Sequence, residues 1–186
     1  MKKLAVLVSV LLLLAGCSQS PDEVETGMEL RSKLLQAPGC SFQAEITADY
    51  GDRLQSFSMD CKADARGDVA FSVRKPDTIS GITGKLSGEG GALTFDVLAL
   101  HFDLMAGEQL SPVSAPWILM KTLRSGYITS GCREEGRIRL SIDDSFRENA
   151  LRLDIWLDRQ NLPQQADILY DGRRILSVAV ADFVIL

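Results

Sequence analysis

Apolar and polar side chains alternate in one short segment after another between residues 41 and 185, and this period of two constrains the fold more than any other feature. In residues 41–47 the apolar side chains of Phe42, Ala44 and Ile46 are separated by polar ones. Successive side chains of a strand point to opposite faces, so each such segment predicts a strand with one apolar and one polar face. Glycine, proline and aspartate between the segments predict turns. We therefore predict a mainly β protein, an antiparallel and strongly curved sheet or barrel of about 10–11 short strands.

Residues 22–36 carry helical spacing instead. Acidic residues stand at the start of this segment, basic residues lie toward its end, and Pro38-Gly39 stops it, as the helix dipole and helix-stop signals require. The residues expected on its apolar face lie three or four positions apart: Val24, Met28, Leu30, the stem of Arg31, Leu34 and Leu35. A helix lying on a membrane is the alternative, although the polar face is not rich in lysine and arginine.

Residues 111–124 form the second helical segment. Two prolines at its head suit the start of a helix. A dense apolar patch follows them and consists of Trp117, Ile118, Met120 and Leu123. We expect the N-terminal helix and this mid-chain helix to cover the apolar side of the sheet.

The N-terminus reads as an export signal. Lys2 and Lys3 precede the apolar residues 4–14, a run too short for a bilayer, which takes roughly 20 residues. The run ends in Leu14-Ala15-Gly16-Cys17, which resembles the lipobox of bacterial lipoproteins. That resemblance implies cleavage before Cys17 and acylation of its sulfur, while an ordinary secretory signal with a chance cysteine is the alternative.

The domain plan follows from this N-terminus. We expect residues 1–16 to be a lipoprotein signal peptide, residues 17–26 a lipidated tether and residues 27–186 one domain, with the leading helix beginning near residue 22. The protein would then sit on the extracytoplasmic face of the cell membrane, held by acyl chains. Loss of Lys2 and Lys3 with the signal lowers the formal charge from −5 to about −7. A nucleic-acid partner is excluded by this acidity and location, and broad binding to anionic lipid is disfavoured.

Three cysteines remain beyond Cys17, on the side of the membrane where disulfides persist. If the hairpin of residues 42–61 turns through a two-residue loop at Tyr50-Gly51, Cys40 lies opposite Cys61 and the apolar faces match. We therefore predict a Cys40–Cys61 disulfide. The rival pairing joins Cys40 or Cys61 to Cys132, which otherwise stays a free thiol.

The order of these elements resembles the LolA/LolB-like fold, an open half-barrel with helices as a lid. The nearest likeness is to LolA-like lipoproteins of Gram-positive, often spore-forming bacteria, including germination lipoproteins of the GerS type. The likeness rests on short pieces spread over most of the mature chain: residues 71–76 (FSVRKP), 79–82 (ISGI), 110–112 (LSP), 124–127 (RSGY), 162–163 (LP), 166–168 (ADI) and 182–183 (DF). It implies the curved half-barrel fold, and one fold serves many tasks.

No catalytic arrangement stands out in the sequence. The single histidine, His101, sits in a predicted strand, so it suits a strand surface better than a general base, and a two-histidine zinc site is excluded. Asp143-Asp144 is an acid pair or a solvated turn, and neighbours in a strand face opposite ways. Cys132 beside Arg133 is an activated thiol, a disulfide partner or an inert cysteine. We predict no enzyme activity, no metal and no cofactor.

Two binding functions remain, and they differ in what fills the apolar face of the sheet. In the first, the face binds an acyl chain or the lipid of a lipoprotein, and the candidate residues are Phe42, Phe57, Phe71, Ile155 and Leu157 with Trp117 and Met120 of the helix. Helix side chains filling the same space are the alternative. In the second, the domain is a tethered adaptor for another envelope protein; the family likeness suggests a cell-wall hydrolase acting in sporulation or germination.

Overall fold

The computed structural model describes residues 21–49, 54–88, 90–95, 98–102, 105–106, 109–147 and 150–186, with residues 93–110 described by their backbone alone. The signal peptide, Cys17 and residues Tyr50-Gly51 lie outside the described residues, so what was predicted for the signal peptide and Cys17 stays a prediction. Within the described part of the chain, no helix combines the length and the hydrophobicity that are needed to cross a membrane.

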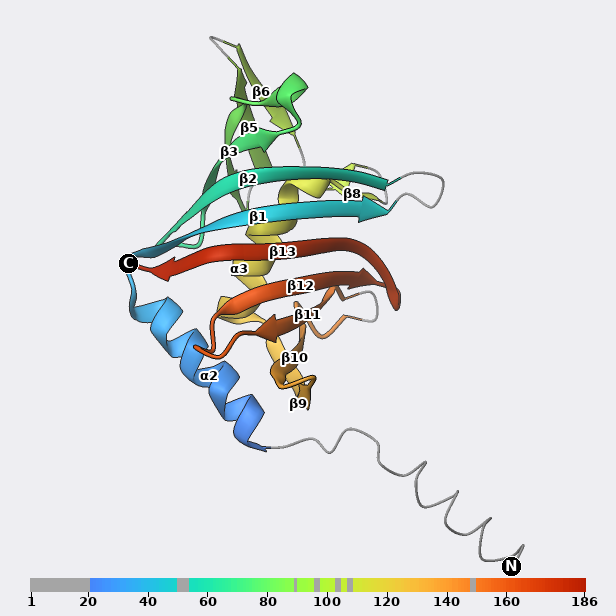
Figure 1. Ribbon diagram of the computed structural model, residues 1–186. Helices are drawn as coiled ribbons and strands as arrows, with labels where there is room; N and C mark the ends of the chain where they lie inside the picture. The colour runs from blue at the N-terminus through green and yellow to red at the C-terminus, as the bar shows by residue number, and fades with distance from the viewer. Residues whose placement is uncertain are drawn as a thin grey trace, which may run out of the picture.

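The described residues form one long antiparallel sheet, a small two-stranded sheet and two α-helices (Figure 1). The elements in order are α2 (Pro21–Gln36), β1 (Gly39–Asp49), β2 (Leu54–Asp64), β3 (Val69–Lys75), the 3-10 turn η1 (Asp77–Ile79), β4 (Thr83–Ser87), β5 (Gly90–Phe95), β6 (Leu98–Phe102), β7 (Met105–Ala106), β8 (Gln109–Leu110), the 3-10 turn η2 (Pro112–Ser114), α3 (Ala115–Ser125), β9 (Tyr127–Glu134), β10 (Arg137–Asp143), β11 (Arg152–Leu157), β12 (Pro163–Tyr170) and β13 (Arg173–Ile185).

The strand order explains why a helix crosses the sheet. The 11-stranded sheet runs β6-β5-β4-β3-β2-β1-β13-β12-β11-β10-β9, and β7 pairs with β8 beside it. The first half of the chain meanders outward from β1 to the edge at β6, and the second half meanders back from the other edge, β9, to β13. The connection between the two edges contains α3, which lies behind the central strands in Figure 1. The mainly β curved half-barrel with a leading and a mid-chain helix is therefore confirmed.

β-bulges bend this sheet. The pairing register shifts in five of the strand pairs, and each such shift increases the local bend and twist of a strand. In β13 the bulge lies between Ala181 and Val184, and Asp182 there has φ of 51°, the left-handed region that aspartate tolerates. The extra residue lets Val180 and Phe183 face inward although they are three positions apart, and Phe183 stacks on Phe42 with ring centroids 5.4 Å apart.

The hairpin register differs from the predicted one by two residues. β1 ends at Asp49, which pairs with Leu54, so four residues rather than two separate the strands. Cys40 therefore lies opposite Ala63, and Cys61 lies opposite Phe42. Both sulfurs still face the core, because a shift of two keeps every side chain on its face.

The predicted Cys40–Cys61 disulfide is consequently wrong in this structure, where both are buried thiols. The rival pairing with Cys132 is wrong as well. Cys132 lies on β9, with four strands between β9 and β1 in the sheet, and it pairs with Arg139 of the outer face, whereas Cys40 and Cys61 face the core.

The leading helix is confirmed, but its apolar face is only partly the predicted one. The buried positions of α2 are Glu23, Gly27, Leu30 and Leu34, whereas the predicted Met28 and Leu35 are exposed. The reason is close packing: a Cβ built on Gly27 would lie 2.7 Å from Cδ1 of Leu140. The face of α2 that packs against the sheet is thus the face that carries Gly27 at the point of closest approach.

Replacing Gly27 by valine should push α2 off β10. The added methyl groups have no room beside Leu140, so we expect the free energy of unfolding in urea to fall by about 1–3 kcal/mol. The matched control is Glu29→Val, which adds the same side chain at an exposed position of the same helix. Equal stability of the two variants would contradict the close approach.

The buried thiols should resist alkylation in the folded protein. Burial raises the pKa of Cys40 to about 11 and also raises the pKa of Cys61, and a protonated thiol is a poor nucleophile. At about pH 8 we expect iodoacetamide to leave both unmodified until denaturant is added, and then to modify both without reductant, as peptide mapping would detect. If both stayed unmodified in denaturant and reacted only after reduction, the disulfide would be present after all.

Candidate functional site

The inner face of the half-barrel gathers most of the predicted ligand-binding residues. Phe42 and Phe71 on β1 and β3, and Ile155 and Leu157 on β11, are buried there, although these strands come from opposite halves of the chain. Met120 of α3 is fully buried against the same core. Strand alternation brings them together, since inward-facing residues of neighbouring strands lie side by side.

Helix α3 fills the centre of this face. Its buried side chains include Ile118, Leu119, Met120 and Leu123. Cys40 donates its thiol hydrogen toward Sδ of Met120, and the two sulfurs are 3.7 Å apart. At its centre, therefore, the sheet packs against helix side chains, the arrangement that the sequence left open as the alternative to a bound acyl chain.

Further apolar side chains pack against this core while keeping part of their surface in solvent. Among them are Phe57, Ile82, Val113 and Trp117. Phe57 lies opposite Ile46 on the inner face, and the backbone of Ile82 accepts a hydrogen bond from the N–H of Val73 at 2.8 Å. We call these four residues the apolar rim. Two of the predicted ligand residues, Phe57 and Trp117, belong to the rim rather than to the filled centre.

Two arginines join the helices at their C-terminal turns. Arg31 of α2 donates from Nε to the carbonyl of Leu123 in α3 at 2.8 Å. Arg124 of α3 donates in return from Nη1 to the carbonyl of Leu34 in α2 at 2.7 Å, and from Nη2 to Ala65 in the turn after β2. Each guanidinium thus meets carbonyls that a helix end leaves without an intrahelical partner. We call this reciprocal pair the arginine clasp.

The clasp lies partly out of water. Burial lowers the pKa of Arg31 from its ordinary value. A guanidinium nevertheless keeps its proton in proteins generally. A charged donor to a carbonyl makes a stronger hydrogen bond than a neutral one. The clasp therefore holds α3 over the inner face through polar contacts at one end, in addition to apolar packing along its length.

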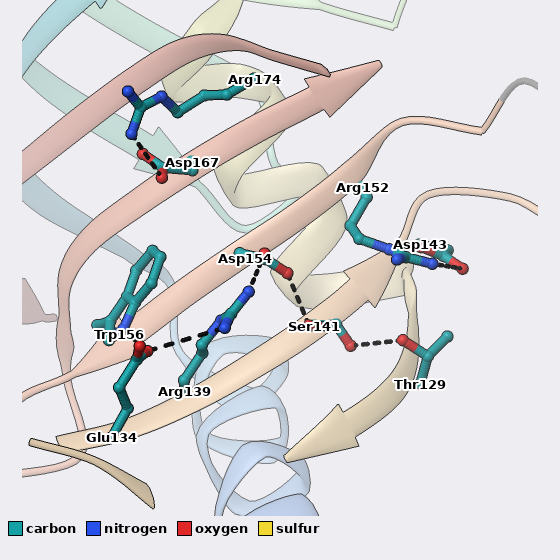
Figure 2. Close-up of polar contacts among 10 residues, drawn as sticks. All are labelled: Thr129, Glu134, Arg139, Ser141, Asp143, Arg152, Asp154, Trp156, Asp167 and Arg174. Atoms are coloured by element: carbon teal, nitrogen blue, oxygen red, sulfur yellow. Dashed lines mark hydrogen bonds and ion pairs between the residues drawn. The ribbon is translucent and has the colours of Figure 1, made fainter. Parts of the chain in front are cut away.

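The outer face of the sheet carries a polar network (Figure 2). Arg139 of β10 donates to Oδ2 of Asp154 on β11 and lies over the ring of Trp156, whose Nε1 donates to Glu134 at 2.8 Å. The hydroxyl of Ser141 donates to the other oxygen of Asp154 at 2.6 Å. The hydrogen bond that Arg139 donates to Asp154 stabilises the charged guanidinium and raises the pKa of Arg139.

A second carboxylate faces Asp154 directly. Asp167 of β12 pairs with it across the strands; their exposed fractions are 6 % for Asp154 and 9 % for Asp167. Ser177 donates to Asp167 at 2.7 Å. Arg174 donates to the other oxygen of Asp167 at 3.4 Å (Figure 2). Because all four oxygens of the two carboxylates accept hydrogen bonds from neighbouring strands, the pair holds strands together rather than presenting an acid and a base to a substrate.

The network borders a polar hollow of about 460 Å³ on the outer face. Its lining alternates in charge and includes Arg139, Asp143, Arg147, Arg152 and Asp154. Arg152 donates from Nε to Asp143 at 2.9 Å, which keeps these two charges paired (Figure 2). The hollow contrasts with the inner face, where apolar side chains predominate.

The remaining predicted residues lie apart from one another. Asp143 ends β10 and accepts a hydrogen bond from Arg152, whereas Asp144 accepts one from the backbone N–H of Leu151 at 2.9 Å. The two carboxylates therefore stabilise a turn, which was one of the two interpretations of Asp143-Asp144. His101 lies on β6, as predicted for a strand, and its side chain is outside the described residues. Cys132 is half-buried on β9 opposite Arg139.

Sequence patterns did not indicate the clasp or the outer network. Arg31 was treated as an apolar stem, and Arg124 only as part of the piece RSGY that carries the family likeness. The one available signal was arginine or aspartate at the outward positions of three consecutive strands, as in Arg139, Asp154 and Asp167.

Replacing Arg124 by methionine should loosen the two helices. The variant keeps the apolar stem and loses two charge-assisted hydrogen bonds, so we expect the free energy of unfolding to fall by about 1.5–3 kcal/mol in urea titrations. Arg66→Met is the control, because Arg66 is 81 % exposed and its contact with Asp64 is 4.0 Å long. A loss no larger than that of the control would show that the clasp contributes nothing to stability.

Comparison with known proteins identifies the fold. No protein-family profile and no curated protein matches the chain. Among solved structures, it is similar to the LolA superfamily protein NE2245 from Nitrosomonas europaea, with a TM-score of 0.50 and 8% identity over 86% of this chain and 93% of that one. Weaker similarities include LprF from Mycobacterium bovis (TM-score 0.45, 12% identity, 92% and 98% covered) and the lipoprotein LppX from Mycobacterium tuberculosis (0.41, 10%, 87% and 93%).

At such low identity the likeness shows the fold alone, and that fold is a LolA-like half-barrel. The resemblance to a LolA-like domain is therefore confirmed. The finer likeness to GerS-type lipoproteins stays a prediction.

Proposed function

We propose that this protein is a membrane-anchored extracytoplasmic lipoprotein whose half-barrel binds an acyl chain or the lipid of a lipoprotein without catalysis. The observation that carries the proposal is the construction of the inner face: an apolar sheet covered by one amphipathic helix and bordered by the apolar rim. Apolar sites with few polar groups are the usual hosts of hydrophobic ligands.

The apolar rim is the surface that such a ligand would contact first. Phe57, Ile82, Val113 and Trp117 keep apolar surface in water, which costs free energy that a bound acyl chain would recover at about 25 cal/mol per Å². Each methylene that is buried contributes about 0.8 kcal/mol, so a chain of several carbons suffices for measurable affinity.

The clasp is compatible with movement of α3. It holds the helix by hydrogen bonds from Arg31 and Arg124 to carbonyl oxygens at one end. The rim residues Val113 and Trp117 lie at the opposite, N-terminal end of α3, so that end can shift while the clasp stays in place. A ligand entering at the rim would take over the contacts that α3 makes with the sheet.

The proposal that the site is non-catalytic rests on the state of its polar groups. The nearly buried carboxylates of Asp154 and Asp167 lie on the outer face and are occupied by neighbouring side chains. The inner face offers apolar side chains and two thiols whose pKa burial raises, which are poor nucleophiles.

Anchoring is proposed through Cys17. The charged leader, the apolar run and the lipobox-like Leu14-Ala15-Gly16-Cys17 support cleavage and acylation there. Two or three acyl chains on one cysteine meet the requirement for stable attachment to a membrane.

Native mass spectrometry tests the binding function. A soluble form comprising residues 18–186, purified from a bacterial envelope, should carry a lipid-sized adduct or acquire one from added fatty acid. In Trp117→Gln, which removes apolar surface from the rim, we expect fatty-acid affinity to fall at least about fivefold, since roughly 1 kcal/mol of apolar contact is lost.

Leu54→Gln is the matched control, because Leu54 is an exposed apolar residue at the start of β2. Circular dichroism would verify that both variants fold. A mass without adduct that persists in the presence of fatty acid and phospholipid would overturn lipid binding and leave a filled core.

A further inference from the structure

Two aromatic rings stand out on the surface at the edge of the sheet. Phe146, in the segment after β10, is 83 % exposed, and Tyr127 at the start of β9 is 43 % exposed. Their ring centroids are 3.6 Å apart. The exposed Arg147 follows Phe146 in the chain. Lys121 of α3 contacts Asp144, two residues before Phe146. We call these four residues the edge patch.

The turn that carries the edge patch is held in place. Asp144 accepts the backbone N–H of Leu151 at 2.9 Å and lies 3.7 Å from Nζ of Lys121. The strand position before it, Asp143, pairs with Tyr127 across β10 and β9. These contacts hold the residues before Phe146 and Leu151 after it, and the ring of Phe146 is exposed, although burying it in the core would be favourable by about 1.5–3 kcal/mol.

The N-terminal anchor would leave the domain beside the same edge. Oε1 of Glu23 lies 2.9 Å from Nε of Arg133, and a Cβ on Gly131 would come within 3.0 Å of Glu23, so α2 begins against β9. From Pro21 back to Cys17 there are four peptide units, which reach at most about 14 Å. Tyr127 lies at the other end of β9, about 13 Å along the strand from Gly131. A bilayer that runs along the β9 edge can therefore hold Cys17 near one end of the strand and contact the edge patch near the other.

The chemistry of the edge patch suits a lipid interface. Aromatic side chains with neighbouring lysine or arginine are enriched at the level of lipid headgroups. Lys121 and Arg147 are offset by Asp143 and Asp144 nearby, and the mature chain is acidic, so attraction to anionic lipid is not the driving force. The driving force left for the edge patch is apolar contact with the interface of a zwitterionic bilayer.

We propose that the edge patch rests in the headgroup region of the membrane that holds Cys17, so that the β9 edge of the half-barrel faces the lipid. This inference depends on the anchoring part of the proposed function. It adds an orientation: the acyl chains attach the domain, and the aromatic pair sets which edge meets the membrane.

The experiment uses the full acylated chain in phosphatidylcholine vesicles, with and without lipid brominated on the acyl chain. A tryptophan is placed at the edge patch by Phe146→Trp or on β2 by Leu54→Trp; both positions are exposed, so neither change disturbs the core. The emission of each variant is compared with that of the parent chain. Bromine quenches only tryptophans that contact lipid, so we expect added quenching for Phe146→Trp alone, at low and high salt alike.

Flotation of the vesicles separates the two ideas. If the chain floats with the vesicles and neither variant shows added quenching, the anchor stands and the contact at the edge patch is overturned. Equal quenching of both variants would also overturn it, because the domain would then have no preferred edge. A chain that does not float would overturn the anchor, and the orientation with it.

Discussion

The crossing of the sheet by α3 is the constraint on which the rest of the structure depends. The chain builds one half of the sheet outward to β6 and must then begin the other half at β9, on the far edge. Its connection lies on the apolar inner face, where an amphipathic helix buries Leu119 and Met120. Bulges curve the sheet around that helix, and Arg31 and Arg124 join it to α2.

The two faces of the sheet are consequently stabilised by different interactions. On the inner face, cohesion comes from apolar packing, which is non-directional and can be replaced by another apolar body such as an acyl chain. On the outer face, Asp154 and Asp167 bind side chains of neighbouring strands through directional hydrogen bonds that keep the strands aligned. The strands are therefore joined by contacts that do not involve α3, as the proposed binding of a hydrophobic ligand on the inner face requires.

The register of the first hairpin is a feature that side-chain alternation cannot predict. Alternation placed Phe42, Met59 and Cys61 on the inner face, and they are buried there. It did not determine which of them lie opposite one another, because registers that differ by two residues leave the same faces inward. Loop length chose between them, and the longer connection after Asp49 moved Cys61 away from Cys40.

The sequence by itself determined the strands, both helices and most residues of the inner face, because these follow from side-chain periods within a few neighbouring positions. Tertiary structure alone decided which stripe of α2 is buried, where Phe57 and Trp117 lie at the rim, and which carbonyls the arginines reach. Arg31 and Leu123 are 92 residues apart in the chain, and Arg124 and Leu34 are 90 apart. Contacts over such separations leave no local period in the sequence, since they depend on how closely Gly27 lets one helix approach the sheet.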